Sequence, residues 1–185
     1  MLLIYVAWIL VLLLILLILL TVLSLIGSQL PDEHLTEVVR DLPIALDDAF
    51  RVMRDLETWQ SWSYYCSARL GNYQSEFSGP RVGLGQVWRW RGNQMSGHME
   101  IRQEWYGMRL LTCVVWDAIP ESKWDRIEFV QHGGLCRIIW QTYGDLPADP
   151  LERVWQVLLG PRMLNRAKKQ SLAGLQAFIE ESDDI

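Results

Sequence analysis

Polar side chains are nearly missing from the first 26 residues of the chain. Only Thr21 and Ser24 interrupt this apolar run, and no charged residue occurs before Asp32. As an α-helix the run is roughly 39 Å long, against a bilayer hydrocarbon core of about 30 Å. The pattern therefore predicts a transmembrane anchor over residues 1–28, followed by a polar linker over residues 29–34.

The same segment differs from a cleaved signal peptide, which has a basic start, a shorter apolar stretch and small residues at its cleavage site. No Lys or Arg precedes the run, and Leu25 and Ile26 stand where small residues are needed. We therefore expect an uncleaved anchor. Acidic residues outnumber basic ones just after it, which favours an extracytoplasmic location for the rest of the chain.

Further along, apolar and polar side chains alternate in two neighbouring segments. Arginines follow both Trp88 and Trp90, and charged or imidazole side chains flank Met99 and Ile101. A period of two is typical of half-buried β-strands. If a loop over residues 92–95 joins the two strands, Trp88 lies opposite Met99 and both apolar faces coincide.

A second hairpin is predicted around two adjacent glycines. A loop over residues 131–134 makes Val130 oppose Leu135, so that the apolar side chains of both strands share one face. That face consists of Ile127, Phe129, Cys136, Ile138 and Trp140.

The remaining elements follow from composition and turn residues. We expect a strand over residues 35–42, a short helix capped by Asp47 or Asp48, a helical turn over 57–62, a strand and irregular loop over 64–83, a strand over 108–116 and a turn over 117–122. The strand over residues 108–116 and the two hairpins make an antiparallel meander of at least five strands within residues 86–143.

The last segment changes to a helical period. Asp149 and Pro150 occupy the positions of an N-cap and a first helical residue, and Gly160-Pro161 is expected to interrupt the helix. A core-facing stripe continues beyond Pro161 through Leu164, Ala167 or Lys168, Leu172, Leu175, Phe178 and Ile179. A long, kinked helix therefore ends the domain.

The apolar residues before Gly160 cover more than one helix face. They are Trp155, Val157, Leu158 and Leu159. Such a segment is either a lid or membrane-contacting element, or it is buried against the sheet, and we expect burial.

Composition and charge exclude several classes of protein. The 17 basic and 22 acidic residues give a net charge of −5 without a basic cluster, so nucleic acid is not expected as a partner. No later segment approaches 18 consecutive apolar residues, which excludes a polytopic transporter. About 155 residues remain for one domain.

The cysteines and histidines show no metal-ligand spacing, and we expect no metal and no cofactor. Cys66, Cys113 and Cys136 are predicted to be buried thiols, although an oxidising compartment would allow one disulfide among them.

The run Ile44–Trp62 resembles the opening of the START-like (SRPBCC) superfamily, in its polyketide cyclase/dehydrase and lipid-transport branch. Such an opening has a helix ending in Asp and then two Trp residues around a short turn, here Asp55, Trp59 and Trp62. Three further segments are similar to the family: Gly83–Trp90, Gly134–Trp140, and Gly174-Leu175 followed by Glu180. The resemblance covers residues 35–182.

The resemblance implies an α+β helix-grip fold, in which a curved antiparallel sheet surrounds the long C-terminal helix. Family members use the cavity between them for lipids, sterols, quinones or polyketides. The predicted ligand-binding residues are Trp88, Trp90, Met99, Ile101, Ile127, Phe129, Ile138, Trp140, Leu164 and Leu172. The same residues could instead form a solid core, and this alternative is equally supported.

No catalytic constellation is visible in the sequence. The alternation turns His98, Glu100, Arg102 and Glu104 away from Met99, and no partner can be named for Asn93, Asp117 or Tyr143. His132 lies in a glycine-rich turn, and Trp59 and Trp62 are expected to pack the short helices.

Three hypotheses about function follow. The preferred one is a membrane-anchored protein that binds a hydrophobic small molecule or lipid, with transfer of that molecule as an extension of the same hypothesis. The alternatives are a cyclase or dehydratase acting on a polyketide-like or isoprenoid substrate, with a titratable group buried in its cavity, and a ligand-free interaction module of a membrane complex, with a filled core and an exposed apolar patch.

Overall fold

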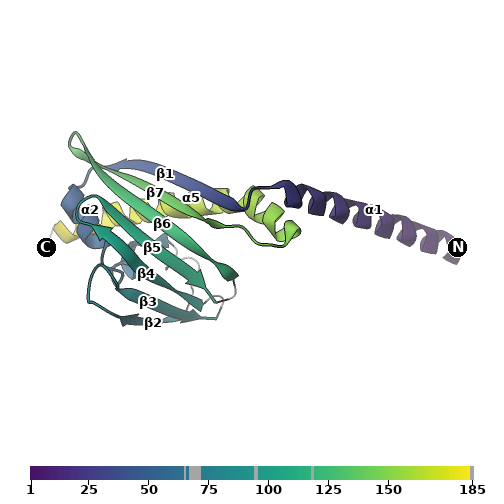
Figure 1. Ribbon diagram of the computed structural model, residues 1–185, viewed down its shortest axis with the longest axis horizontal. Coiled ribbons are helices and arrows are strands. Elements are labelled where there is room, and N and C mark those ends of the chain that lie inside the picture. Colours follow the sequence, from purple (N-terminus) through teal and green to yellow (C-terminus); the bar gives the residue numbers. More distant parts are fainter. Residues whose placement is uncertain (65, 67–71, 94–95, 118, 184–185) are drawn as a thin grey trace.

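The computed structural model describes residues 1–64, 66, 72–93, 96–117 and 119–183 (Figure 1). Within these residues the elements follow one another as α1 (Leu2–Gln29), β1 (Glu33–Leu42), α2 (Leu46–Met53), α3 (Trp59–Trp62), β2 (Tyr73–Ser78), β3 (Val87–Gly92), β4 (Ser96–Trp105), β5 (Arg109–Trp116), β6 (Ile119–His132), β7 (Leu135–Asp145) and α5 (Pro150–Asp183).

The strands form one antiparallel sheet in the order β1-β7-β6-β5-β4-β3-β2. Consecutive strands from β2 to β7 are neighbours, and β1 joins the open side of β7. The sheet curves, and α5 runs along its length (Figure 1). This is the predicted helix-grip arrangement: β3 to β7 are the five strands of the predicted meander, and β1 and β2 overlap the segments 35–42 and 64–83, where further strands are expected.

The predicted register of the first hairpin is confirmed, because Trp88 pairs with Met99. The predicted register of the second hairpin is wrong by two residues. His132 pairs with Leu135, so the loop has only two residues, and Gly133 at its first position has a φ of +63°. A glycine with positive φ suits a two-residue hairpin turn. Since the error is a multiple of two, the apolar faces still coincide.

Two local predictions are also corrected. The N-cap of α2 is Ala45, and no side chain caps the helix, so Asp47 and Asp48 lie inside its first turn instead of before it. The turn predicted over residues 117–122 is shorter, because β6 already begins at Ile119, whose partner on β5 is Trp116.

Helix α5 begins as predicted. The Asp149 carboxylate accepts hydrogen bonds from the backbone N–H groups of Leu151 and Glu152, both at 2.9 Å. Pro161 lies inside the helix and does not end it. Because proline lacks an N–H group, one helical hydrogen bond is missing there, and the helix changes direction between its first turns and the remainder (Figure 1).

Helix α1 projects away from the sheet (Figure 1). The most apolar 18 residues within Ile4–Gln29 have a mean hydropathy of 3.5, and none of them is buried. By length and composition this helix can cross a bilayer. Since α1 reaches Gln29 and β1 starts at Glu33, three residues connect them. The division into anchor, linker and domain stays a prediction.

The expected burial of the first turns of α5 is wrong for three of the four residues in question. Trp155, Leu158 and Leu159 are exposed, at 63%, 60% and 44% of their surface, while Val157 is half-buried. The cause is geometric, because the segment lines the cavity under the sheet through Gln156 and Gly160, and the exposed side chains lie on its other side, beside the end of α1 (Figure 1).

Candidate functional site

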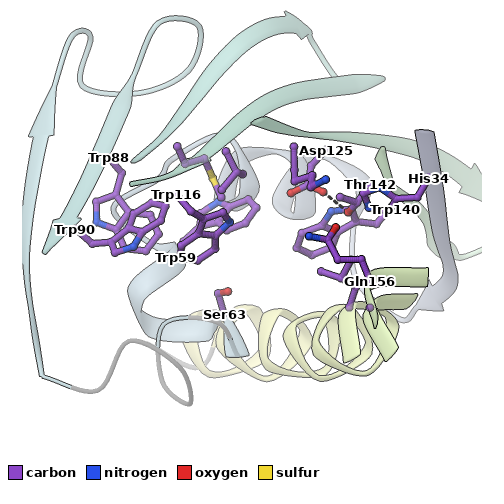
Figure 2. A pocket seen from close by; sticks show the side chains of 15 residues that line it. His34, Trp59, Ser63, Trp88, Trp90, Trp116, Asp125, Trp140, Thr142 and Gln156 are labelled. Carbon is purple, nitrogen blue, oxygen red and sulfur yellow. Dashed lines mark hydrogen bonds between the residues drawn. The ribbon is translucent and has the colours of Figure 1, made fainter. Parts of the chain in front are cut away.

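A cavity of about 260 Å³ lies between the concave face of the sheet and α5. Side chains from β1, β3, β4, β5, β6 and β7 form its roof, and α5 together with the α3 region forms its floor (Figure 2). For comparison, an enclosed apolar cavity of about 150 Å³ holds one benzene molecule. The space therefore suits roughly ten non-hydrogen atoms.

Tryptophan side chains form most of the apolar wall. Trp88 and Trp90 lie at one end of the cavity, and Trp59 and Trp116 lie near its middle (Figure 2). The ring centroids of Trp88 and Trp90 are 4.8 Å apart, and those of Trp90 and Trp116 are 5.1 Å apart. Trp59 donates its indole hydrogen bond to the Met53 carbonyl and Trp88 to the Ser75 hydroxyl. Two of these rings are thereby fixed.

Polar side chains gather at the opposite end, where Figure 2 places Asp125, Thr142, His34 and Gln156. The sheet register explains this group. Thr36 on β1 pairs with Thr142 on β7, which pairs with Asp125 on β6, which pairs in turn with Thr112 on β5. One row across four strands therefore places buried polar side chains at the same level of the inner face.

Asp125 is the carboxyl group of this row. Thr142 donates its hydroxyl hydrogen to Oδ1 of Asp125, and the residue is 8% exposed. Burial raises the pKa of the Asp125 carboxyl, because a low-dielectric environment disfavours the charged form. The positive charge of Lys168 and the hydrogen bond from Thr142 act in the opposite direction.

Lys168 approaches the same region from α5 and is fully buried. Its ammonium group donates hydrogen bonds to the carbonyl and hydroxyl oxygens of Thr36, both at 3.1 Å, and to the Trp140 carbonyl at 3.2 Å. Burial lowers the pKa of Lys168 to about 8, although the negative charges of Asp125 and Glu37 oppose the shift. A lysine and a carboxyl group thus share one buried region.

His34 and Lys123 complete the polar end. Burial and the charge of Lys123 lower the pKa of His34, which favours the neutral imidazole. In that form Nδ1 donates to the Gly144 carbonyl at 3.0 Å, which leaves Nε2 as an acceptor. Burial also lowers the pKa of Lys123, whose ammonium group donates to the carbonyl oxygen of Asp145.

The ten residues predicted to bind a ligand fall into two groups. Five line the cavity: Trp88, Trp90, Met99, Trp140 and Leu164. The other five are buried in the described structure without lining it: Ile101, Ile127, Phe129, Ile138 and Leu172. The latter pack the core beneath and beside the cavity. A ligand-binding role for any of the ten stays a prediction.

Sequence reasoning missed the polar end of the cavity, although the strand period contained a signal for it. Asp125 lies two residues before Ile127 on β6, and Thr142 lies two residues after Trp140 on β7. The inward-facing stripes of both strands therefore become polar at the same end of the sheet. In the helical stripe the sequence leaves Ala167 and Lys168 as alternatives for one core position. The structure buries both residues.

The other polar candidates lie away from the cavity. Glu104 forms an ion pair with Arg54 at 2.8 Å, and Glu100 forms one with Arg102 at 3.1 Å. Asn93, Asp117 and His132 are exposed, and His98 is half-buried on the outer face. Among the described residues, no three side chains of His, Cys, Asp or Glu are placed to hold a metal ion. The three cysteines are free and buried.

No protein-family model matches the sequence, and no curated protein does either. Solved structures do match in three dimensions. Protein SA2116 of Staphylococcus aureus, of unknown function, has a TM-score of 0.67 at 10% identity, over 83% of this chain and 98% of that one. A Thalictrum norcoclaurine synthase variant, in complex with a transition-state analogue, has a TM-score of 0.58 at 12% identity, over 84% and 99%.

A third matching structure is Ara h 8.0201, with a TM-score of 0.52 at 12% identity over 80% of this chain and 99% of that one. At these identities the likeness establishes the helix-grip fold and leaves the function to be argued from the site. The matches to SA2116 and to norcoclaurine synthase leave less than a fifth of this chain uncovered, and the match to Ara h 8.0201 leaves a fifth uncovered.

Proposed function

We propose that this protein is a membrane-anchored binding protein for a compact hydrophobic molecule with one polar group. The observation that supports this most directly is the cavity itself, with Trp88 and Trp90 at one end and Asp125, Thr142 and His34 at the other. Apolar walls with a few placed polar groups are typical of small-molecule sites. The exposed apolar helix α1 supports membrane anchoring.

The size of the cavity narrows the class of ligand. A volume of about 260 Å³ is slightly below the range of about 300–1,000 Å³ for drug-sized ligands. A single ring, a short isoprenoid unit or the end of a longer chain fits this space, whereas two acyl chains do not. The polar group of the ligand would face Asp125 and the acceptor nitrogen of His34.

Gly160 offers a way to test the proposal, because it lines the cavity and no atom lies within 4 Å of where its Cβ would be. Gly160→Phe should fill the cavity from α5, and Gly160→Ala is the matched control. The full chain is purified in mild detergent, and bound compounds are identified by native mass spectrometry and organic extraction. We expect a compound with the wild type and the alanine variant, and loss of it with the phenylalanine variant.

The binding proposal would be rejected if the wild-type chain, expressed in its native membrane, released no compound. It would also be rejected if the phenylalanine variant retained as much compound as the alanine variant. Thermal unfolding of the phenylalanine variant at or above the wild-type temperature would show that the blocked cavity, and not a damaged fold, explains the loss.

A second candidate function is catalysis on a polyketide-like or isoprenoid substrate by a cyclase or dehydratase. The supporting observation is Asp125, a buried carboxyl group with a raised pKa at the cavity wall, since a general acid needs its proton near neutral pH. The norcoclaurine synthase structure belongs to an enzyme with a similar fold. The third hypothesis, a module with a filled core, is not supported by the cavity.

The two candidates differ in what Asp125→Asn does. For an enzyme, the compound extracted from the variant would be unreacted substrate and would differ in mass or retention time from the wild-type compound. For a binding protein, both would release the same compound. The asparagine keeps an oxygen that can accept the Thr142 hydrogen bond, so the fold should be retained.

A further inference from the structure

The first turns of α5 expose an apolar surface beside the end of α1. Its side chains are Trp155, Leu158, Leu159 and Met163, exposed at 63%, 60%, 44% and 51% of their area. Four large apolar side chains on neighbouring turns of one helix form a contiguous patch, and such patches mark interaction sites. We call these four residues the α5 patch.

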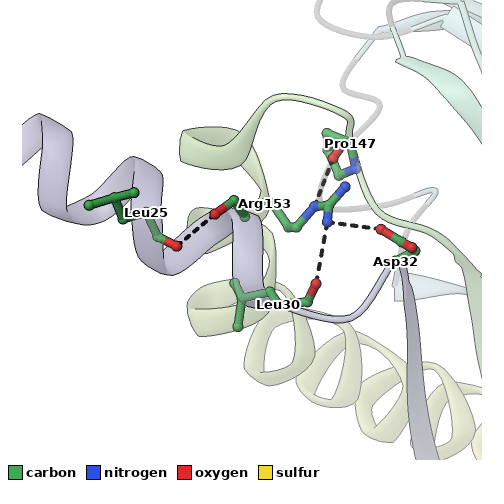
Figure 3. A network of polar contacts seen from close by, with 6 residues as sticks. Leu25, Leu30, Asp32, Pro147 and Arg153 are labelled. Carbon is green, nitrogen blue, oxygen red and sulfur yellow. Dashed lines mark hydrogen bonds and ion pairs between the residues drawn. The ribbon is translucent and has the colours of Figure 1, made fainter.

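The position of the α5 patch relative to α1 is fixed by direct contacts. Gly27 of α1 approaches Pro150 so closely that a Cβ on the glycine would lie 2.0 Å from the proline carbonyl oxygen. Arg153 donates hydrogen bonds to the carbonyl oxygens of Pro147 at 3.1 Å and Leu30 at 3.3 Å, and pairs with Asp32 at 2.9 Å (Figure 3). The patch therefore lies where α1 joins the domain.

Two arginines lie on the same helix face as the α5 patch, beyond its first three residues. At 3.6 residues per turn, Arg162 and Arg166 fall in line with Trp155 and Leu159, one to three turns further from α1. Both arginines are exposed, and neither forms an ion pair among the described residues. Along this face Trp155, Leu158 and Leu159 come first, and the two arginines lie on either side of Met163, further from α1; the exposed Glu152 precedes Trp155 by one turn.

This order is complementary to the layers of a bilayer surface. Apolar and aromatic side chains of interfacial helices lie at the boundary between acyl chains and head groups, while Lys and Arg contact the phosphates. The apolar end of the face is the end that contacts α1, which is the element long and apolar enough to span the bilayer.

The other side of the same helical segment lines the cavity through Gln156, Gly160 and Leu164. We infer that the first turns of α5 dock on the bilayer surface through the α5 patch, with Arg162 and Arg166 on lipid phosphates, and that this segment is the wall between the membrane and the ligand cavity. The inference rests on the proposed anchoring of α1 and identifies the partner surface as an anionic lipid bilayer.

Fluorescence depth measurements on the full chain test this docking. The chain is reconstituted in vesicles of phosphatidylcholine and phosphatidylglycerol, with an environment-sensitive NBD dye on Leu158→Cys or, as the matched control, on Ala173→Cys. Ala173 is exposed on the same helix but further from α1. The wild-type chain, treated in parallel, reports any labelling of the buried native cysteines.

We expect blue-shifted emission from position 158, quenched by lipids with a doxyl group near the head-group region, and emission from position 173 quenched by aqueous iodide. Water-like emission and iodide quenching at position 158 would overturn the inference. Disulfide cross-linking between two chains through Leu158→Cys, in excess of that through Ala173→Cys, would also overturn it, because a second copy would then cover the patch.

Charge reversal tests the role of the arginines. Arg162→Glu/Arg166→Glu should move the dye at position 158 towards water in anionic vesicles, whereas Arg89→Glu/Arg91→Glu, on exposed positions of β3, should not. Equal responses to both would contradict the inference. None of these readouts needs a bound ligand, so a failure to find a ligand counts against the proposed function alone, and a water-exposed patch counts against the docking alone.

Discussion

The ammonium nitrogen of Lys168 lies 3.1 Å from both the carbonyl oxygen and the hydroxyl oxygen of Thr36, although the residues are 132 positions apart in the sequence. This contact joins α5 to the edge strand β1, beneath the polar end of the cavity. A buried lysine stabilises the fold only through these bonds and at the cost of removing its charge from water.

The pH dependence of stability should reveal this buried charge. The pKa of Lys168 is lowered from 10.5 to about 8. Between these values the unfolded chain binds more protons than the folded one, so the penalty from Lys168 is present below pH 8 and disappears as the pH rises towards 10.5. Lys168→Met removes this penalty. The free energy of unfolding of the variant, relative to wild type, should therefore be highest below pH 8.

Denaturant titrations of the full chain in detergent, below pH 8 and near pH 10, measure this difference. The control is Lys169→Met, at the exposed neighbouring position, whose difference from wild type should not change over the same window. A pH-independent difference for Lys168→Met would contradict the assigned pKa shift.

Asp125→Asn should show the acidic counterpart of this effect. Burial raises the pKa of the Asp125 carboxyl above the ordinary value of 3.8, so the folded state binds the extra proton and the contribution of Asp125 to stability decreases as the pH rises through its folded pKa. The asparagine variant should therefore gain stability relative to wild type with rising pH. Unfolding at acidic and neutral pH measures this, and Asp117→Asn, at an exposed position, should change little.

Two glycines of α5 should respond to alanine with opposite signs. At Gly160 a Cβ meets no atom within 4 Å, so Gly160→Ala should stabilise the protein by about 0.5–1 kcal/mol through its higher helix propensity. At Gly174 a Cβ would lie 2.3 Å from the Trp62 carbonyl oxygen, so Gly174→Ala should destabilise by about 1–3 kcal/mol. Chemical unfolding measures the change in the free energy of unfolding for both variants. Changes of the same sign would contradict the packing of α5 on α3.

The cysteines should react slowly in the folded protein. Burial raises the pKa of Cys66 to about 12 and that of Cys136 to about 11, so the reactive thiolate is scarce at neutral pH. Titration with a thiol reagent at neutral pH should label the native chain slowly and the denatured chain completely at three sites. Rapid labelling of the native chain would contradict the burial of these thiols.

Much of the fold follows from short-range patterns in the sequence. The alternation around Trp88 and Met99 was sufficient for the register of the first hairpin, because hydrophobic pattern and loop length agreed. The second register was wrong because two loops of different length preserve the same faces, and only the conformation of Gly133 distinguishes them. The start of α5 at Asp149 was predictable because capping is local.

The candidate site was predictable only in its apolar half. Trp88, Trp90 and Met99 line the cavity, whereas Ile127 and Phe129 have the same strand pattern and pack the core. Strand period determines which face a side chain occupies, but not whether another side chain fills the space above it. The ring of Phe50 on α2 lies 5.3 Å from that of Phe129, so the distinction between a wall and a filled core depends on which helix side chains cover each strand.

By itself, the sequence determined an apolar helix long enough for a bilayer, the inner and outer faces of the central strands, and the long C-terminal helix, because charge distribution, period and capping act over a few residues. Only the tertiary structure decided that Lys168, Thr36, Thr142 and Asp125 share one buried region, where Thr142 and Asp125 line a cavity, and that the first turns of α5 expose an apolar side beside α1. The physical reason is that burial, and the pKa shifts that follow from it, arise where distant segments pack against one another.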